Sequence, residues 1–194
     1  MPHSALHERA AESLEFIRDT MARSTSFTAV PGRGGVAMGV VGIVASLAAS
    51  RAATPWTWLG VWLAAALIAA PIALIAMHVK ARAHGVTLWA GSGRRFMQGF
   101  VPALAGGAIL TWAIVRAERF ELLPPAWLLA YGAGVLAGAT ASVPVLTWLG
   151  GGIMLLGAAA SLTGQWGDMW LGAGFGALQI VFGIRPSNAF EQVT

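Results

Sequence analysis

Six apolar runs separated by short polar connections constrain this sequence more than any other feature. We place them near residues 35–50, 56–79, 96–115, 125–143, 145–163 and 168–184. Each has about the 17–25 residues that cross a bilayer as a helix, or slightly fewer. The fourth and fifth runs are separated only at Ser142-Val143-Pro144. Because one helix over both runs would be far too long for a single crossing, we expect two helices joined by a tight turn.

The composition excludes several classes of protein. Only 10 % of the 194 residues are charged and 57 % are hydrophobic, whereas a soluble domain carries about 25 % charged residues. Cysteine is absent, which excludes disulfide scaffolds, thiolate nucleophiles and iron–sulfur clusters. The net charge is +4, but the basic residues lie at the ends of apolar runs and form no patch that follows phosphates. Nucleic acid is therefore excluded as a partner.

The fold class that follows is all-α. We expect a six-span transmembrane helical bundle over residues 31–194, preceded by an amphipathic cytoplasmic helix and linker over residues 1–30. With the N-terminus in the cytoplasm, nine of the twelve Lys and Arg residues fall on the cytoplasmic side, an excess typical of cytoplasmic loops. Both termini are therefore predicted to be cytoplasmic, and membrane lipid is the first expected partner. Four basic residues are candidates for binding lipid headgroups: Lys80, Arg82, Arg94 and Arg95.

The N-terminal segment carries a narrow apolar stripe at helical spacing, which includes Leu6, Leu14, Ile17 and Met21. The polar positions of this segment hold four acidic residues against three arginines, whereas a helix that binds anionic lipid is usually basic. We therefore expect the stripe to dock on a protein, either on loops of this chain or on another subunit.

The predicted spans contain few polar groups. No charged residue lies near the centre of a span, which argues against proton pumps and antiporters that need intramembrane carboxylates. The strongly polar candidates are Gln98 and Gln179. In one interpretation they line a polar ligand cavity. In the other, which we favour, each amide bonds to a neighbouring helix and stabilises the bundle by about 0.6–2 kcal/mol.

The sequence contains no recognisable catalytic or metal-binding set. His78 ends the second span, and His84 follows six residues later, a distance that does not match helical metal-ligand pairs. Carboxylates on the outer side, Asp168 among them, are accompanied by no nucleophile, histidine or metal set, so we interpret them as solvated loop charges. We therefore expect no enzymatic activity, no metal and no cofactor.

Small residues four apart allow helix backbones to approach closely. Three glycine pairs of this kind lie in the predicted spans, and they serve either packing within the bundle or homodimerisation: Gly35 and Gly39, Gly134 and Gly138, and Gly172 and Gly176.

Several segments together resemble an uncharacterised family of small bacterial polytopic integral membrane proteins. The most distinctive is Ala29-Val30-Pro31-Gly32, and Gly93-Arg94-Arg95-Phe96 and Ile180-Val181-Phe182-Gly183 fit the same pattern. The resemblance implies six membrane spans in a bacterial inner membrane and no particular reaction. The family often carries a histidine where this chain has Gln179, so the resemblance gives no support to a haem ligand there.

Two functions remain after these exclusions. We expect a non-catalytic accessory or scaffolding subunit that packs against other membrane proteins, because the chain lacks catalytic groups and has a docking stripe and close-packing glycines. The alternative is a small transporter or channel, which could function as a homo-oligomer. It fits the number of spans, but the spans lack charged residues and obvious breaks; Pro71 and Pro102 fall inside spans, where they can kink a helix.

Overall fold

A computed structural model describes residues 32–83, 91–140 and 144–184 of the chain. These residues form helices and, over those ranges, no strand. Six of the described helices are long and apolar enough to cross a membrane, which confirms the predicted all-α bundle. The elements are α2 (Gly32–Ala49), α3 (Pro55–Ala83), α4 (Gly91–Arg116), the 3₁₀ turn η1 (Phe120–Leu122), α5 (Leu123–Ala139), α6 (Pro144–Thr163), α7 (Gly167–Leu171), the π-helical segment η2 (Gly172–Leu178) and α8 (Gln179–Ile184).

The sixth span is a single run of helix made of α7, η2 and α8. Its π-helical part was not expected from the sequence. The fourth and fifth runs are two helices, α5 and α6, as expected. Pro71 lies inside α3 and Pro102 inside α4. The expected N-terminal helix and its candidate docking residues lie outside the described residues: Leu6, Leu14, Ile17 and Met21.

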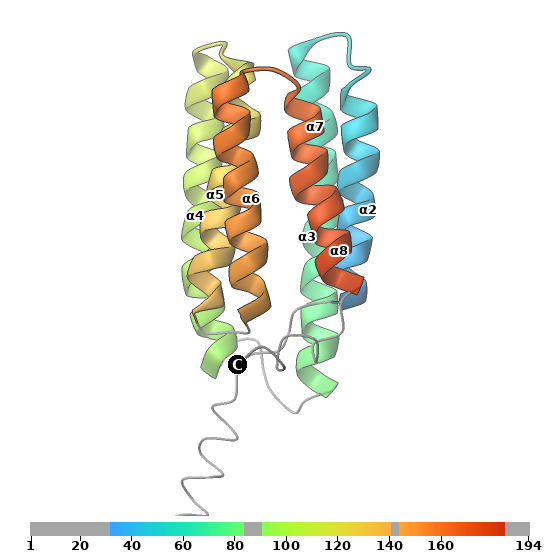
Figure 1. Cartoon of the computed structure of the whole chain (residues 1–194), viewed down its shortest axis with the longest axis vertical. Coiled ribbons are helices and arrows are strands. Elements are labelled where there is room, and N and C mark those ends of the chain that lie inside the picture. The colour runs from blue at the N-terminus through green and yellow to red at the C-terminus, as the bar shows by residue number, and fades with distance from the viewer. Residues whose placement is uncertain (1–31, 84–90, 141–143, 185–194) are drawn as a thin grey trace, which may run out of the picture.

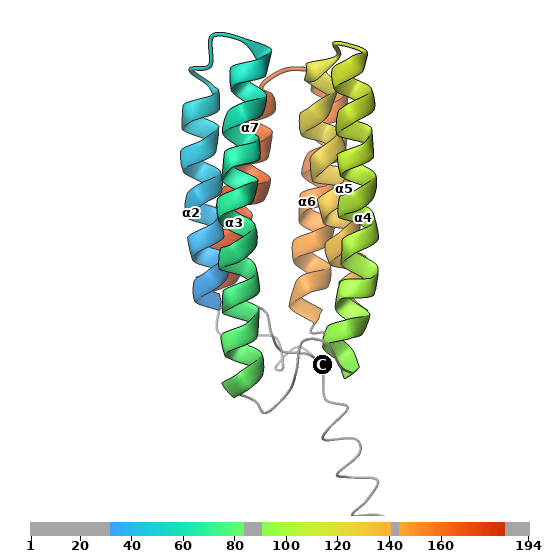
Figure 2. The ribbon, with the colours of Figure 1, turned by 180° about the vertical axis from the view of Figure 1, so that it is seen from behind.

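The six spans form two groups of three (Figures 1 and 2). One group contains α2, α3 and the sixth span, and the other contains α4, α5 and α6; the most extensive packing lies within each group. The groups meet mainly where the sixth span contacts α5 and α6. By contrast, α3 and α4 make only limited contact with each other. The end of the bundle at the top of Figure 1, which joins α2 to α3, α4 to α5 and α6 to α7, is called the upper end below.

Glycines bring α2 against the sixth span. A Cβ on Gly39 would lie 2.7 Å from the carbonyl oxygen of Gly176, and a Cβ on Gly42 would lie 2.5 Å from that of Phe175. A Cβ on Gly35 would be in ordinary contact, 3.5 Å from the carbonyl oxygen of Gln179. Two of the three helices of this group therefore touch backbone to backbone, which only glycine permits.

The second group is also packed closely through glycines. A Cβ on Gly132 of α5 would lie 2.8 Å from the carbonyl oxygen of Gly150 of α6. On the other side of α5, Gly134 and Gly138 face the rings of Phe100 and Phe96 of α4. Each helix thus fits its neighbour through small residues and aromatic rings.

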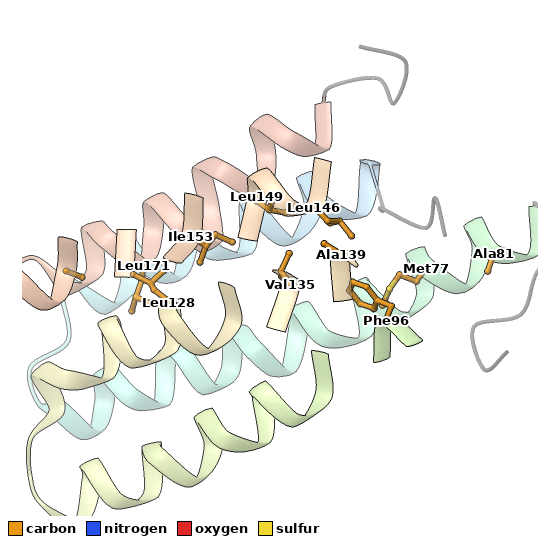
Figure 3. Packing of buried hydrophobic residues seen from close by; sticks show 11 residues of the cluster. Met77, Ala81, Phe96, Leu128, Val135, Ala139, Leu146, Leu149, Ile153 and Leu171 are labelled. Atoms are coloured by element: carbon orange, nitrogen blue, oxygen red, sulfur yellow. The ribbon is translucent and has the colours of Figure 1, made fainter. Parts of the chain in front are cut away.

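The buried core joins the two groups (Figure 3). Leu128 of α5 and Ile153 of α6 are completely buried, and Leu171 of α7 packs into the same cluster. Toward the other end, Met77 of α3 lies beside Phe96 of α4 (Figure 3). A space remains between the two groups beside this core.

Candidate intramembrane ligand cavity

A cavity of about 300 Å³ lies between the two helix groups. Helices α2, α3, α4 and α5 and the sixth span all contribute to its wall. Helices α3 and α4, which face the viewer in Figure 2, both contribute residues to its wall. Leu63, Ala66 and Ala70 of α3 line the cavity and are exposed, and the cavity is partly open. The cavity therefore opens toward the surface that faces lipid.

The wall is almost entirely apolar and aromatic. Aromatic rings follow one another from α3 to α4: Trp62 lies 6.4 Å from Phe175, Phe175 lies 5.0 Å from Tyr131, and Tyr131 lies 5.4 Å from Phe100, measured between ring centroids. The last two pairs are edge-to-face, an arrangement that stabilises by about 0.5–1.5 kcal/mol beyond the buried area. This row, extended by Trp58 and Phe96, links both groups along the cavity.

One polar pair faces this apolar space. Gln179 Nε2 donates a hydrogen bond of 3.1 Å to the Tyr131 hydroxyl, and both residues line the cavity. Gln179 is only 7 % exposed. A phenol has one donor and two acceptor positions, and an amide has two donors and a carbonyl acceptor. One mutual bond therefore leaves capacity on both groups to bind a hydrogen-bonding ligand.

The π-helical segment carries part of the cavity wall. Its hydrogen bonds run from i to i+5, and residues four apart lie close to one face, as they do in an α-helix. Leu171, Phe175 and Gln179 have this spacing, and all three line the cavity. On other sides of the segment, Gly174 packs against Leu128 and Gly176 against Ile43. π-Helical segments occur frequently at functional sites.

At the upper end of the cavity, Asp168 ties three helices together. Its carboxylate Oδ1 accepts hydrogen bonds from Trp58 Nε1 at 2.6 Å and from Trp62 Nε1 at 3.3 Å. Its backbone carbonyl accepts a bond of 2.7 Å from Ser46 Oγ of α2. The interpretation of Asp168 as a solvated loop charge was therefore wrong. The signal that sequence reasoning missed was the four-residue spacing of the two tryptophans, which places both on one face of α3.

A second interhelical bond lies on the opposite wall. Trp127 Nε1 of α5, which lines the cavity, donates to Thr111 Oγ1 of α4 at 2.8 Å. Thr111 Oγ1 in turn donates to the carbonyl of Gly107 at 2.8 Å. This bond holds the tryptophan ring in place between α4 and α5.

The candidate residues from the sequence are distributed unevenly around this cavity. Gln179 combines both earlier interpretations, because it bonds to a neighbouring helix and lines the cavity. Gln98 does neither: it is exposed on α4 and lies outside the cavity lining, so the favoured interpretation of a bond to a neighbouring helix holds for Gln179 and not for Gln98. Gln98 follows Arg94 by four residues and Arg95 by three, and all three are exposed. This helical spacing, which places Gln98 on the polar face of α4, was the signal that could have distinguished it from Gln179.

The basic and small candidates lie elsewhere. Arg82, Arg94 and Arg95 are exposed at the lower ends of α3 and α4, where Lys80 is partly buried, and their binding to headgroups stays a prediction. The paired glycines are all used in contacts between helices of this chain, including Gly172, whose Cβ would meet the Ser46 side chain at 2.6 Å.

The described residues contain no group of three or more His, Asp or Glu side chains that could hold a metal ion. Near the upper end, Asp168 accepts the bonds described above, Glu121 forms an ion pair with exposed Arg119, and Glu118 is exposed. The apolar wall with its single polar pair offers a site that can bind a ligand. In comparisons with protein-family models, curated proteins and solved structures, nothing matches this chain.

Proposed function

We propose that this protein is a non-catalytic membrane protein that binds an uncharged, membrane-soluble organic molecule between its two helix groups. The observation that carries the proposal is the cavity of about 300 Å³, whose wall comes from five spans and is apolar apart from the Tyr131–Gln179 pair and indole nitrogens. Small-molecule sites are typically apolar hollows with a few placed polar groups.

The lining selects against charge. Among the described residues that form the wall, none is charged. An ionised group at this depth would cost at least about 2.5–3.5 kcal/mol, with no countercharge on the wall to offset it. An uncharged carbonyl or hydroxyl, by contrast, can bond to the Tyr131 hydroxyl or the Gln179 amide.

The depth of the polar pair restricts the ligand further. Tyr131 lies eight residues after the start of α5 at Leu123, which is about 12 Å along a helix. A phospholipid keeps its charged headgroup at the interface and cannot bring it to this level without losing hydration. The polar pair therefore fits a molecule whose own polar group enters the hydrocarbon region. The aromatic wall favours a flat ring or an unsaturated chain.

Access from the membrane is consistent with this class of ligand. The wall residues Leu63, Ala66 and Ala70 reach the lipid-facing surface of α3. A molecule dissolved in the bilayer can therefore reach the cavity between α3 and α4 without passing through water.

A titration with a probe of this chemistry tests the proposal. The probe is ubiquinone with a single isoprene unit, an uncharged ring with carbonyl oxygens that quenches tryptophan fluorescence. Three cavity tryptophans, Trp58, Trp62 and Trp127, serve as reporters. We expect saturable quenching in detergent micelles, and linear quenching without saturation would contradict the proposal.

A pair of matched variants separates the cavity from general partitioning. Ala69 lines the cavity, whereas Ala64 lies on the same helix, exposed and outside the lining. Ala69→Phe fills the space and should abolish saturable quenching. Ala64→Phe adds the same ring to the outer surface and should leave it unchanged.

A second candidate function is the accessory subunit. The observation that favours it is the exposure of α3 and α4, whose apolar spans are only 6 % buried within the chain, against 50 % for the span that contains α5. Leu67 of α3 is 76 % exposed and Ile109 of α4 68 %. The predicted docking stripe of the N-terminal segment supplies the test of this function. Replacing Leu14 and Ile17 with Asp should release a partner protein during purification from the native membrane. Unchanged recovery of a complex would contradict it.

A further inference from the structure

A second, more open pocket of about 420 Å³ lies at the upper end of the bundle. Residues from all three upper connections and the adjoining helix ends form its wall, including Thr54, Glu121 and Gln165. These side chains are exposed, and the pocket is more polar than the intramembrane cavity. It therefore faces water when the bundle spans a membrane.

Trp58 lies between the two spaces. It is the residue that lines both the upper pocket and the intramembrane cavity. Its indole N–H donates to Asp168 Oδ1, and Asp168 lines the upper pocket. The ring of Trp58 therefore forms part of the floor of the upper pocket and part of the ceiling of the cavity.

The position of this ring depends on Asp168. The 2.6 Å bond from Trp58 is supported by the bond from Trp62 to the same oxygen and by that from Ser46 to the Asp168 carbonyl. The bond to Asp168 thus fixes the orientation of the Trp58 indole, and the other two bonds hold Asp168 in place.

The connection before Asp168 is held in an unusual backbone conformation. Trp166 has φ 57° and Gly164 has φ 61°, in the left-handed region. For a tryptophan this conformation costs about 1–3 kcal/mol, and such strain persists where the surrounding structure enforces it, commonly at ligand clamps and switches. The strain lies two residues before the carboxylate that holds Trp58.

We propose that the upper pocket and the intramembrane cavity are two parts of one path, and that Trp58, held by Asp168, is the gate between them. The protein then transfers an uncharged organic molecule between the membrane interior and the water at its upper end. This activity goes beyond the proposed function, because a binding site reached from lipid needs no connection to water. The topology predicted from Lys and Arg places the upper end outside the cell.

The absence of cysteine allows a test that needs no ligand. Single cysteines are introduced into the full chain in lipid nanodiscs, where both membrane faces are accessible. The probe is a small uncharged methanethiosulfonate, which the apolar cavity can admit and which reacts with a thiol only where water allows it to ionise to the thiolate. Three reporters cover the path and its surroundings: Ala53→Cys in the upper pocket, Ala69→Cys in the cavity and Leu67→Cys on the lipid-facing side of α3.

With the gate intact, Ala53→Cys should react fast and the other two reporters slowly. Adding Asp168→Ala or Trp58→Ala should accelerate labelling of Ala69→Cys at least tenfold and leave Leu67→Cys slow. Trp58→Phe keeps an aromatic ring but removes the indole N–H, so it should accelerate labelling by less than Trp58→Ala.

Two results would overturn the gate. One is an unchanged labelling rate of Ala69→Cys in Asp168→Ala, Trp58→Ala and Trp58→Phe alike. The other is equal acceleration at Leu67→Cys, which would show that the bundle has loosened as a whole. The labelling rates test only the gate, and saturable quenching by the quinone tests only ligand binding. The two proposals can therefore be refuted independently.

Discussion

Replacing Gly42 with alanine tests whether backbone contact between α2 and the sixth span builds the wall of the cavity. A Cβ at this position would lie 2.5 Å from the carbonyl oxygen of Phe175, 2.7 Å from its carbonyl carbon and 2.9 Å from the nitrogen of Gly176. All three atoms belong to the backbone. No side-chain rotation can relieve the overlap, and the helices must separate.

The size of the effect follows from these distances. Ordinary contact begins near 3.4 Å, so the helices must move apart by about 0.9 Å at this point. A gap of 0.5–1 Å forfeits about a quarter to a half of the dispersion energy of the facing atoms. Overpacking of this kind costs about 1–3 kcal/mol, which lowers the ratio of folded to unfolded protein by about 5- to 150-fold.

The assay is reversible unfolding in mixed micelles, followed by tryptophan fluorescence and far-UV circular dichroism. Gly60→Ala is the matched control, because a Cβ on Gly60 of α3 would meet nothing within 4 Å. We expect Gly42→Ala to lower the free energy of unfolding by about 1–3 kcal/mol relative to Gly60→Ala. Equal stability of the two variants would refute the assigned contact between α2 and the sixth span.

Three further substitutions probe the polar groups of the spans. Tyr131→Phe should lower the melting temperature, because it leaves the Gln179 amide without its acceptor at a cost of about 1–3 kcal/mol, and adding Gln179→Leu should restore part of the loss; a double variant less stable than Tyr131→Phe would contradict this. Thr111→Val removes the acceptor of the Trp127 indole and should destabilise by about 0.6–2 kcal/mol, whereas Thr147→Val, at an exposed position, should not; equal melting temperatures would count against the bond. Gln98→Leu should leave both the melting temperature and quinone binding unchanged, and loss of binding would place Gln98 in the site after all.

The number of spans could be predicted because the information is local. A run of about 20 apolar residues is long enough to cross a bilayer whatever it packs against. The division of the fourth and fifth runs followed from the same length argument, and α5 and α6 are indeed separate helices. Span ends were less certain: α3 continues to Ala83, beyond the predicted end at residue 79, because the long stems of Lys80 and Arg82 can stay in the apolar layer while their charges reach its edge.

The arrangement of the spans could not be predicted in the same way. A soluble helix reveals its buried face through alternation of polar and apolar residues, but a span surrounded by lipid is apolar on every side. Gln179 illustrates the consequence, since it is buried although its apolar run indicates no buried face. The glycine pairs indicated close packing without indicating partners. That Gly42 meets Phe175 emerges only from the fold.

The cavity itself was beyond sequence reasoning for the same reason. Trp58, Trp62 and Trp127 each fit the usual interfacial role of tryptophan, yet all three line the cavity. Asp168 is separated from Trp58 by 110 residues, and no local pattern connects them. The spacing of Trp58 and Trp62 on one face of α3 was the one available signal.

Native mass spectrometry of the protein extracted from its own membrane in mild detergent tests the central claim most directly. We predict a stoichiometric, uncharged organic adduct on the 20.1 kDa chain, retained in Ala64→Phe and lost in Ala69→Phe. A chain that carries no adduct, or an adduct retained equally in Ala69→Phe, would contradict ligand binding in the cavity. Release together with larger, different chains and without an adduct would support the accessory subunit in its place.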